Sequence, residues 1–386
     1  MRAYERRMEM DRCLIVVIDG CAPDYLTPET APNIYRLARA HGFVKEVQSA
    51  VPTVTNVNHA CILSGKFPED TKIVGNYYYD PDTGEEGFIE ERGFMKAPTI
   101  LNAYGKMGKK TAFLTVKGKV LGVYGEGADI GISVQAPDKL LLSRLGLDMP
   151  PEVSDLSSTR WIMEAALACI EKEHPDFVYC TTNDYGFHHY GPETSEARLQ
   201  MRWIDEYIGR IHEADPGRRI YITADHGMNQ KKRLLNVKHI ADNKGIPLYC
   251  LAPLKDRYVE NHIYQEGGIL YLFLENEKDG ERLCALAEEI PEIEKILGRE
   301  EAAALYHLPE DRIGDYVIFA SEGCAFGEVE GEYLVTDQVR THGSLYERQI
   351  PLAAIHPLKG EGDYQYSKDI VAHMMRDFEN AGWRLG

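Results

Sequence analysis

Short runs of apolar residues recur along this chain, and stretches with a helical spacing of apolar positions lie between them. Four of the runs are predicted strands, at residues 13–20, 111–116, 175–182 and 219–227. Three of the intervening stretches are predicted amphipathic helices, at residues 31–42, 99–108 and 159–174. Continuous apolar strands that alternate with helices are typical of a mainly parallel β-sheet covered by helices on both faces. The pattern therefore predicts an α/β protein.

Acidic and imidazole side chains follow three of these apolar runs. Asp19 ends the run "VVID", and Asp184 lies shortly after "FVYCTT". The pair Asp225 and His226 comes directly after "IYITA". The carboxyl ends of parallel strands share one edge of a sheet, and ligands bind beyond that edge. We therefore expect these residues to converge on one site.

The spacing of apolar residues changes after about residue 235. The phrases "GGILYLFLEN", "DGERLCALAEEI" and "DYVIFAS" predict a small α/β unit between "ITADHG" and "THGSLYERQIPL". We therefore predict a core at residues 1–234, an inserted smaller α/β cap at residues 235–338, and a return to the core at residues 339–386. The returning segment carries His342, so it can complete a site that the first part of the core begins.

Charge and cysteine usage limit the partners of this chain. Its 386 residues carry a formal net charge of -18 at pH 7. Nucleic acids and anionic membranes attract basic proteins, so neither is an expected partner. Eight cysteines without a CxxC pair predict buried thiols in a reducing compartment. The stretch "CLIVVI" is too short to span a membrane, so we expect a cytoplasmic protein. The sequence does not decide between a monomer and a homodimer.

Carboxylates, imidazoles and one hydroxyl are the candidates for chemistry at the predicted sheet edge. They are Asp19, Asp184, Asp225, His188, His226, His342 and Thr55. This combination of ligands suits two zinc ions. Each residue alone also has an ordinary explanation, since Asp19 precedes a turn glycine and His342 reads as a surface histidine. Their coincidence at strand ends favours a metal site.

The order of these motifs resembles the alkaline phosphatase superfamily, in its nucleotide pyrophosphatase/phosphodiesterase-like branch. The resemblance runs through "IDG", "PTVTNVNH", "LSGKFPEDTKIVGNYYYD", "DYGFHHYGP", "TADHGM" and "THGS". It implies an alkaline-phosphatase-like core, a mostly parallel sheet flanked by helices, and two Zn²⁺ ions per chain. The implied ligands of one ion are Asp184, His188 and His342, with His189 as a rival to His188. The implied ligands of the other are Asp19, Asp225, His226 and Thr55.

The same resemblance implies a nucleophile and an amide donor. Thr55 would attack phosphorus, because a zinc ion can stabilise its alkoxide. Asn76, in "VGNYYYD", would donate a hydrogen bond to a phosphoryl oxygen. A turn residue beside Gly75 would look the same in the sequence. The implied reaction is hydrolysis at phosphorus through a phospho-threonine intermediate.

Other phrases resemble the phosphonoacetate hydrolases of this branch, which cleave a carbon–phosphorus bond. They are "GNYYYD", "GEE", "APTIL", "TVKGK", "LPEDRIGD" and "ERQIPL". This resemblance implies that Lys117 and Lys119 bind the substrate carboxylate. Cleavage of a C–P bond expels a carbanion, which two ammonium groups beside an adjacent carboxylate would stabilise. The expected substrate is phosphonoacetate, or a close carboxylated phosphonate, and the products are phosphate and acetate. A solvated Lys-Gly-Lys turn is the ordinary alternative.

One departure keeps a second function open. The segment after Thr55 reads "NVNHA", and its Asn58-His59 pair is more like the phosphodiesterases. A phosphodiesterase or nucleotide pyrophosphatase that acts on nucleotide-like or aryl phosphodiesters would need the same metals and Thr55, but no lysine pair. His262, in the predicted cap, is a further candidate for substrate binding, and a surface histidine is the equal alternative.

Overall fold

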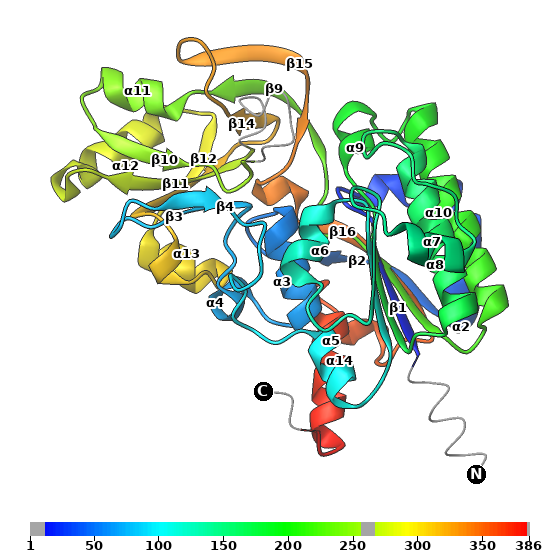
Figure 1. Ribbon diagram of the computed structural model, residues 1–386. Helices are drawn as coiled ribbons and strands as arrows, with labels where there is room; N and C mark the ends of the chain where they lie inside the picture. The colour runs from blue at the N-terminus through cyan, green and yellow to red at the C-terminus, as the bar shows by residue number, and fades with distance from the viewer. Residues whose placement is uncertain (1–11, 256–266, 384–386) are drawn as a thin grey trace.

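A seven-stranded sheet forms the centre of the computed structural model, which describes residues 12–255 and 267–383 (Figure 1). The strand order is β2-β16-β8-β1-β7-β5-β6. The parallel strands at its centre and one side are β1 (Cys13–Val17), β5 (Thr111–Thr115), β6 (Ile130–Ser133), β7 (Phe177–Thr181) and β8 (Arg219–Thr223). Only β16 (Gln349–Ile355) runs antiparallel to its neighbours, β8 and β2 (Gly42–Gln48). The prediction of a mostly parallel sheet is confirmed.

Helices cover both faces of this sheet (Figure 1). One face carries α2 (Pro32–His41), α7 (Lys139–Leu145), α8 (Ser157–Glu173) and α10 (Ser195–Ala214). The other face carries α3 (Thr55–Ser64), α5 (Ile100–Lys106), α6 (Gly118–Tyr124) and α14 (Asp369–Asn380). Because both faces are covered, every residue of β1, β7 and β8 is buried, and each strand is a nearly continuous apolar run. The predicted helices correspond to α2, α5 and α8.

Three smaller sheets lie beside the central one. The antiparallel sheet β10-β11-β13-β12 consists of β10 (Leu248–Leu251), β11 (Ile269–Leu274), β12 (Ile293–Gly298) and β13 (Tyr316–Ala320). Its helices are α11 (Val237–Asn243), α12 (Gly280–Glu289) and α13 (Arg299–Tyr306). The sheet β14-β9-β15 consists of β9 (Asn229–Leu235), β14 (Cys324–Phe326) and β15 (Tyr333–Thr341). A hairpin of β3 (Tyr77–Tyr79) and β4 (Glu86–Phe88) follows the short helix α4 (Pro68–Thr71).

The boundaries of the predicted cap, at residues 235 and 338, stay a prediction. Strand β9 reaches the first boundary, and strand β15 crosses the second. The apolar residues of β10–β13 form buried clusters separate from the cluster around the central sheet. These separate clusters support a second folding unit, because each unit needs its own core.

The chain turns at the carboxyl edge of the central sheet in a way that brings β1 and β7 close together. Gly20, just beyond β1, has a φ of +75°, and a Cβ atom added there would lie 3.1 Å from Asp184 Cβ. A side chain at this position would be strained and crowded, so glycine is required. The turn allows the carboxylates that follow the two strands to approach each other.

The described residues show two further features. None of their helices is long and apolar enough to cross a membrane. All eight cysteines of the chain are free thiols.

The burial of β1 generates a stability prediction. Ile15 lies at the middle of this strand and is 0% exposed, so Ile15→Ala should cost about 2–5 kcal/mol of unfolding free energy by leaving a cavity. Chemical denaturation measures this loss. Leu140, which is 85% exposed, provides the matched control: Leu140→Ala should change stability by roughly 0.5 kcal/mol or less. Similar losses in both variants would contradict the assignment of β1 to the core.

Candidate active site

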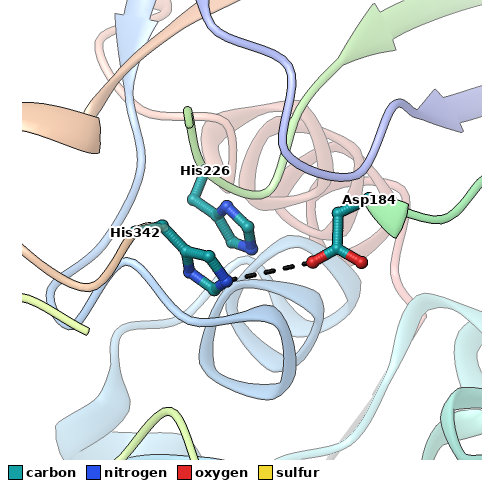
Figure 2. Close-up of side chains that lie close together, drawn as sticks. All are labelled: Asp184, His226 and His342. Carbon is teal, nitrogen blue, oxygen red and sulfur yellow. Dashed lines mark ion pairs between the residues drawn. The ribbon is translucent and has the colours of Figure 1, made fainter. Parts of the chain in front are cut away.

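Residues from distant parts of the chain meet at the carboxyl edge of the central sheet. Figure 2 shows the side chains of Asp184, His226 and His342 turned toward one another. The rings of His226 and His342 stack with their centroids 3.6 Å apart and 10° between their planes. His342 Nε2 lies 3.9 Å from Asp184 Oδ2. The predicted convergence of these residues is therefore present in the fold.

Two overlapping groups at this edge have the geometry of metal ligands. In each group the potential ligand atoms all lie within 4.8 Å of one another, and the groups are Asp184, His226 and His342, and Asp19, Asp225 and His226. His226 Nε2 lies 3.6 Å from Asp19 Oδ1 and 3.4 Å from Asp225 Oδ2. His226 thus belongs to both groups.

His188 lies at the edge of the first group. It belongs to the short helix α9 (Tyr185–His189), and its Nε2 is 3.2 Å from Asp184 Oδ2. The ring of the rival candidate, His189, packs against Tyr185 with centroids 4.8 Å apart. The geometry therefore favours His188 over His189 as a partner of Asp184, and the division of ligands between two ions stays a prediction.

The three histidines share one orientation. In each ring Nδ1 bonds a backbone carbonyl: His188 to Arg340 at 2.7 Å, His226 to Gly227 at 2.9 Å, and His342 to Thr53 at 2.6 Å. A carbonyl oxygen can only accept, so each Nδ1 carries the hydrogen. The lone pair of a neutral ring then lies on Nε2, which faces the site. Ligating histidines are commonly held in this way.

The three carboxylates affect one another strongly because they are buried together. Burial and the neighbouring Asp184 and Asp225 raise the pKa of Asp19 to about 8. Burial raises the pKa of Asp225 to about 7, with Asp184 adding to the effect. Burial also acts to raise the pKa of Asp184, but Lys117 and His188 hold it well below its usual range. Asp19 and Asp225 therefore give up their protons less readily than a free carboxyl group, unless a bound cation balances the charge.

The residues of the site fit a divalent cation. Asp19 Oδ1 and Asp225 Oδ2 are buried and have no hydrogen-bond partner within residues 12–255 and 267–383. Burial lowers the pKa of His226 and of His342, which favours the neutral form that binds metal. Buried carboxylate oxygens without hydrogen-bond partners, close to imidazole nitrogens, are a donor set that zinc binds. Bound cations would also balance the carboxylate charge.

A protein cation already lies between the carboxylates. Lys117 Nζ is 2.8 Å from Asp19 Oδ2 and 2.7 Å from Asp184 Oδ1. Lys117 is the N-cap residue of α6, just beyond β5, so its place follows from the same sheet edge. Lys119 lies in the first turn of α6 and is 9% exposed. Lys117 therefore lies at the site, and Lys119 follows it two residues later in the same helical turn.

Thr55 is the first residue of α3 and is 2% exposed. Its Oγ1 lies 3.2 Å from His226 Nε2. Asn76 lies beside the next residue of this helix, because its Oδ1 accepts a hydrogen bond of 3.3 Å from Asn56 N. The predicted nucleophile and amide donor are therefore neighbours. The predicted contact His262 lies outside the described residues.

Sequence reasoning missed the residues that support this site from behind. Thr53 bonds the segment of His342, and its only signal was that it shares the phrase "VPTVT" with Thr55. Lys231 and Glu347 form an ion pair of 2.6 Å with both side chains 0% exposed. Nothing in the phrase "NQKKRLL" distinguishes Lys231 from its exposed neighbour Lys232.

Comparison with known proteins follows this geometry. Residues 13–345 match the family model of type I phosphodiesterase / nucleotide pyrophosphatase. The chain belongs to this family. This family member is 25% identical over 234 residues to the venom phosphodiesterase of Macrovipera lebetinus, a match that covers 58% of the chain and 26% of the relative. It is 24% identical over 249 residues to human ectonucleotide pyrophosphatase/phosphodiesterase family member 1, a match that covers 60% of the chain and 25% of the relative. The matched part is thus about a quarter of the length of these relatives.

Solved structures resemble this family member over nearly its whole length. Phosphonoacetate hydrolase from Sinorhizobium meliloti 1021, in complex with phosphonoacetate, has a TM-score of 0.83 and 28% identity, with 94% of this chain and 95% of that chain covered. Murine ectonucleotide pyrophosphatase/phosphodiesterase 5 has a TM-score of 0.67 and 17% identity, with 95% of each chain covered, and shows the fold alone. The predicted alkaline-phosphatase-like fold is confirmed.

The crowding of carboxylates generates a prediction about Asp19. Asp19→Asn should lower the metal content from about two ions per chain, because it removes a ligand. It should also stabilise the chelator-treated protein at mildly alkaline pH, by on the order of 1 kcal/mol, because only two buried carboxylates then repel each other. Elemental analysis and thermal unfolding measure the two effects. A chelator-treated variant less stable than the chelator-treated wild type would contradict the role assigned to repulsion.

Proposed function

We propose that this family member is a zinc-dependent hydrolase that cleaves the C–P bond of phosphonoacetate, or of a close carboxylated phosphonate. The observation that carries the proposal is the position of Lys117, whose ammonium lies among the carboxylates of the candidate metal site. A lysine so close to the reacting centre suits a substrate that carries a carboxylate next to phosphorus. The similarity to phosphonoacetate hydrolase over nearly the whole chain supports the same substrate class.

The residues would divide the work as follows. One ion would be held by Asp184, His188 and His342, and the other by Asp19, Asp225, His226 and Thr55. When bound, the ions supply the positive charge that favours the alkoxide form of a coordinated hydroxyl. Thr55 provides that hydroxyl at the N-terminus of α3, where the helix dipole also favours negative charge.

The reaction proceeds in two displacements at phosphorus. The Thr55 hydroxyl releases its proton to water as Oγ forms a bond to phosphorus, and the C–P bond breaks with its electron pair moving onto the carbon and its adjacent carboxylate. Lys117 and Lys119 stabilise this enolate-like group, which takes a proton from water and leaves as acetate. A water oxygen then attacks the phospho-threonine, so that phosphate leaves and the Thr55 hydroxyl is restored. The sum is phosphonoacetate plus water giving acetate plus phosphate.

Charge balance explains how Lys117 can serve the substrate. Its ammonium pairs with Asp19 and Asp184, which are also candidate metal ligands. Divalent cations on these carboxylates would replace the lysine as their counter-charge. Lys117 could then pair with the substrate carboxylate without leaving any of the buried charges unpaired.

The second candidate function is hydrolysis of nucleotide-like or aryl phosphodiesters, and membership of the phosphodiesterase family favours it. The Asn58-His59 pair does not distinguish a phosphonoacetate hydrolase from a phosphodiesterase. The Asn58 side chain bonds backbone atoms of Ala50 and Pro52, and His59 Nδ1 bonds the Tyr179 hydroxyl at 2.7 Å. Both side chains therefore secure the segment around Thr55 from inside the core.

Location and assembly belong to the proposal as well. The free thiols of all eight cysteines support a reducing compartment such as the cytoplasm. For the assembly, a monomer and a homodimer both stay open.

Thr55 generates the first functional prediction. Thr55→Ala should lower kcat by about three orders of magnitude or more, because no hydroxyl remains to attack phosphorus. Most of the metal should stay bound, since the carboxylate and imidazole ligands remain. Steady-state kinetics and elemental analysis measure the two quantities, and quenched wild-type enzyme should carry a phosphoryl group on Thr55. Wild-type turnover in the variant would remove Thr55 from the mechanism.

The second functional prediction concerns the lysine pair, Lys117 and Lys119. Lys117→Ala and Lys119→Ala should each cost on the order of 2–4 kcal/mol in kcat/KM for phosphonoacetate. The loss should be nearly absent for an aryl phosphodiester, which has no carboxylate to bind. Lys139→Ala, at an exposed position of α7, is the matched control and should leave both substrates unaffected.

The pattern across substrates distinguishes the two candidate functions. Equal losses on both substrates would show that the lysines do not recognise a carboxylate. Brisk hydrolysis of the diester by wild-type enzyme that does not cleave phosphonoacetate would assign the protein to the phosphodiesterases.

A further inference from the structure

Two segments of the site are joined by a contact outside the main sheets. Thr53 and Gly343 form an isolated antiparallel bridge. Thr53 shortly precedes Thr55, and Gly343 directly follows His342. The bridge therefore connects the segment of the proposed nucleophile to the segment of a proposed metal ligand, although the two are far apart in the chain.

Thr53 bonds three successive residues across this bridge. Its Oγ1 accepts a hydrogen bond of 2.9 Å from Gly343 N and donates one of 2.9 Å to Ser344 O. Its carbonyl oxygen accepts the hydrogen of His342 Nδ1 at 2.6 Å. The side chain is 0% exposed, so water does not compete for these bonds. One residue thus fixes both the ring and the backbone around His342.

Glu347 holds the same turn from the other side. Its Oε2 accepts hydrogen bonds from Ser344 N at 2.8 Å and Ser344 Oγ at 2.6 Å. Its Oε1 accepts from Lys231 Nζ at 2.6 Å and Asn229 Nδ2 at 3.0 Å. Both carboxylate oxygens are therefore fully used, and a buried ammonium balances the buried negative charge.

Glu347 also reaches the segment of the other central histidine. Its backbone oxygen accepts a hydrogen bond of 2.8 Å from Gly227 N, and Gly227 directly follows His226. His226 and His342, whose rings stack, are therefore both attached to this one residue through their chain neighbours.

The turn has little room to move. Gly343 has a φ of +102°, and a Cβ added there would lie 2.9 Å from Gly268 N. Gly268 N in turn donates a hydrogen bond of 2.9 Å to His342 O. A shift of the turn would break several buried hydrogen bonds at once, and each buried polar group left without a partner destabilises the protein.

We propose that Thr53 and Glu347 are positioning residues that hold His342 and His226 at the separation that metal binding requires. The inference rests on the proposed metal-dependent function. Residues that orient metal ligands typically affect metal affinity by about 10–100-fold when they are replaced. Thr53 and Glu347 would thus act on the reaction through the histidines, without touching the substrate.

Thr53→Val is the decisive variant, because valine keeps the shape of threonine and removes the two hydrogen bonds of Oγ1, while the backbone carbonyl that accepts from His342 Nδ1 remains. Zinc affinity, measured by competition with a chromophoric chelator, should fall about 10–100-fold. At saturating zinc, kcat should fall while KM stays near the wild-type value, because the substrate contacts remain. Thr53→Ser restores the hydroxyl and should restore both quantities.

Thr111→Val is the matched control. Thr111 is also 0% exposed, and its Oγ1 bonds Gly127 O at 3.0 Å and Asp129 Oδ2 at 3.1 Å, at the amino end of β5. The control should lose stability without losing zinc affinity. This comparison separates a positioning role from a general loss of packing.

Glu347→Gln tests the second residue. Glutamine offers one carbonyl oxygen where the carboxylate offers two, so either Lys231 or Ser344 loses its acceptor. Zinc affinity should fall as in Thr53→Val. It should recover in part in the double variant Lys231→Met, Glu347→Gln, because the remaining oxygen is then available to Ser344.

The outcomes are distinguishable. Wild-type protein that binds about two zinc ions, together with unchanged zinc affinity in Thr53→Val and Glu347→Gln, would overturn the positioning role and leave the proposed function intact. An equal loss of zinc affinity in Thr111→Val would also overturn it. Active wild-type protein that binds no metal would overturn the proposed function and this inference with it.

Discussion

The confinement of three carboxylates at one edge of a parallel sheet is the constraint on which the site depends. Asp19, Asp184 and Asp225 follow neighbouring strands, so the hydrogen bonding of β7, β1 and β8 brings them together before any ligand is present. Their burial makes ionisation costly, as the raised pKa values of Asp19 and Asp225 show. The ionised carboxylates thus need positive charge beside them. Lys117 supplies part of it, and divalent cations would supply the rest.

The imidazoles add nitrogen ligands to the carboxylates, and the hydrogen bonds and burial of each ring determine its protonation. Each Nδ1 is committed to a backbone carbonyl, and burial disfavours a second proton on His226 and His342. These rings consequently contribute lone pairs and no positive charge. The central sheet supplies the carboxylates, while backbone segments that pass over its edge set the direction of the rings.

The parts of this design that could be predicted are those with a local signal. The apolar run of β1 and the Asp19 that ends it lie within a few residues of each other, so strand and strand end could both be inferred from sequence. Lys231 and Glu347 could not, because their pairing depends on a contact between segments separated by most of the cap, and a lysine among other charged residues gives no sign of burial. The sequence also did not predict that His226 belongs to both groups of potential ligands, because a sequence motif does not give the distances between side chains.

The pairing of β9 with β15 has a consequence for how this architecture can vary. β9 begins shortly after His226 and β15 ends just before His342, and their partners at the base are Asn229 with Thr341 and Gln230 with Arg340. The two strands therefore form a neck: whatever the chain does between them, it leaves and re-enters the core at fixed points. The hydrogen bonds between β9 and β15 offset the entropic cost of bringing the ends of this long segment together. Insertions or exchanges of whole modules between the two strands can accordingly change this part of the chain while the two histidines keep their places.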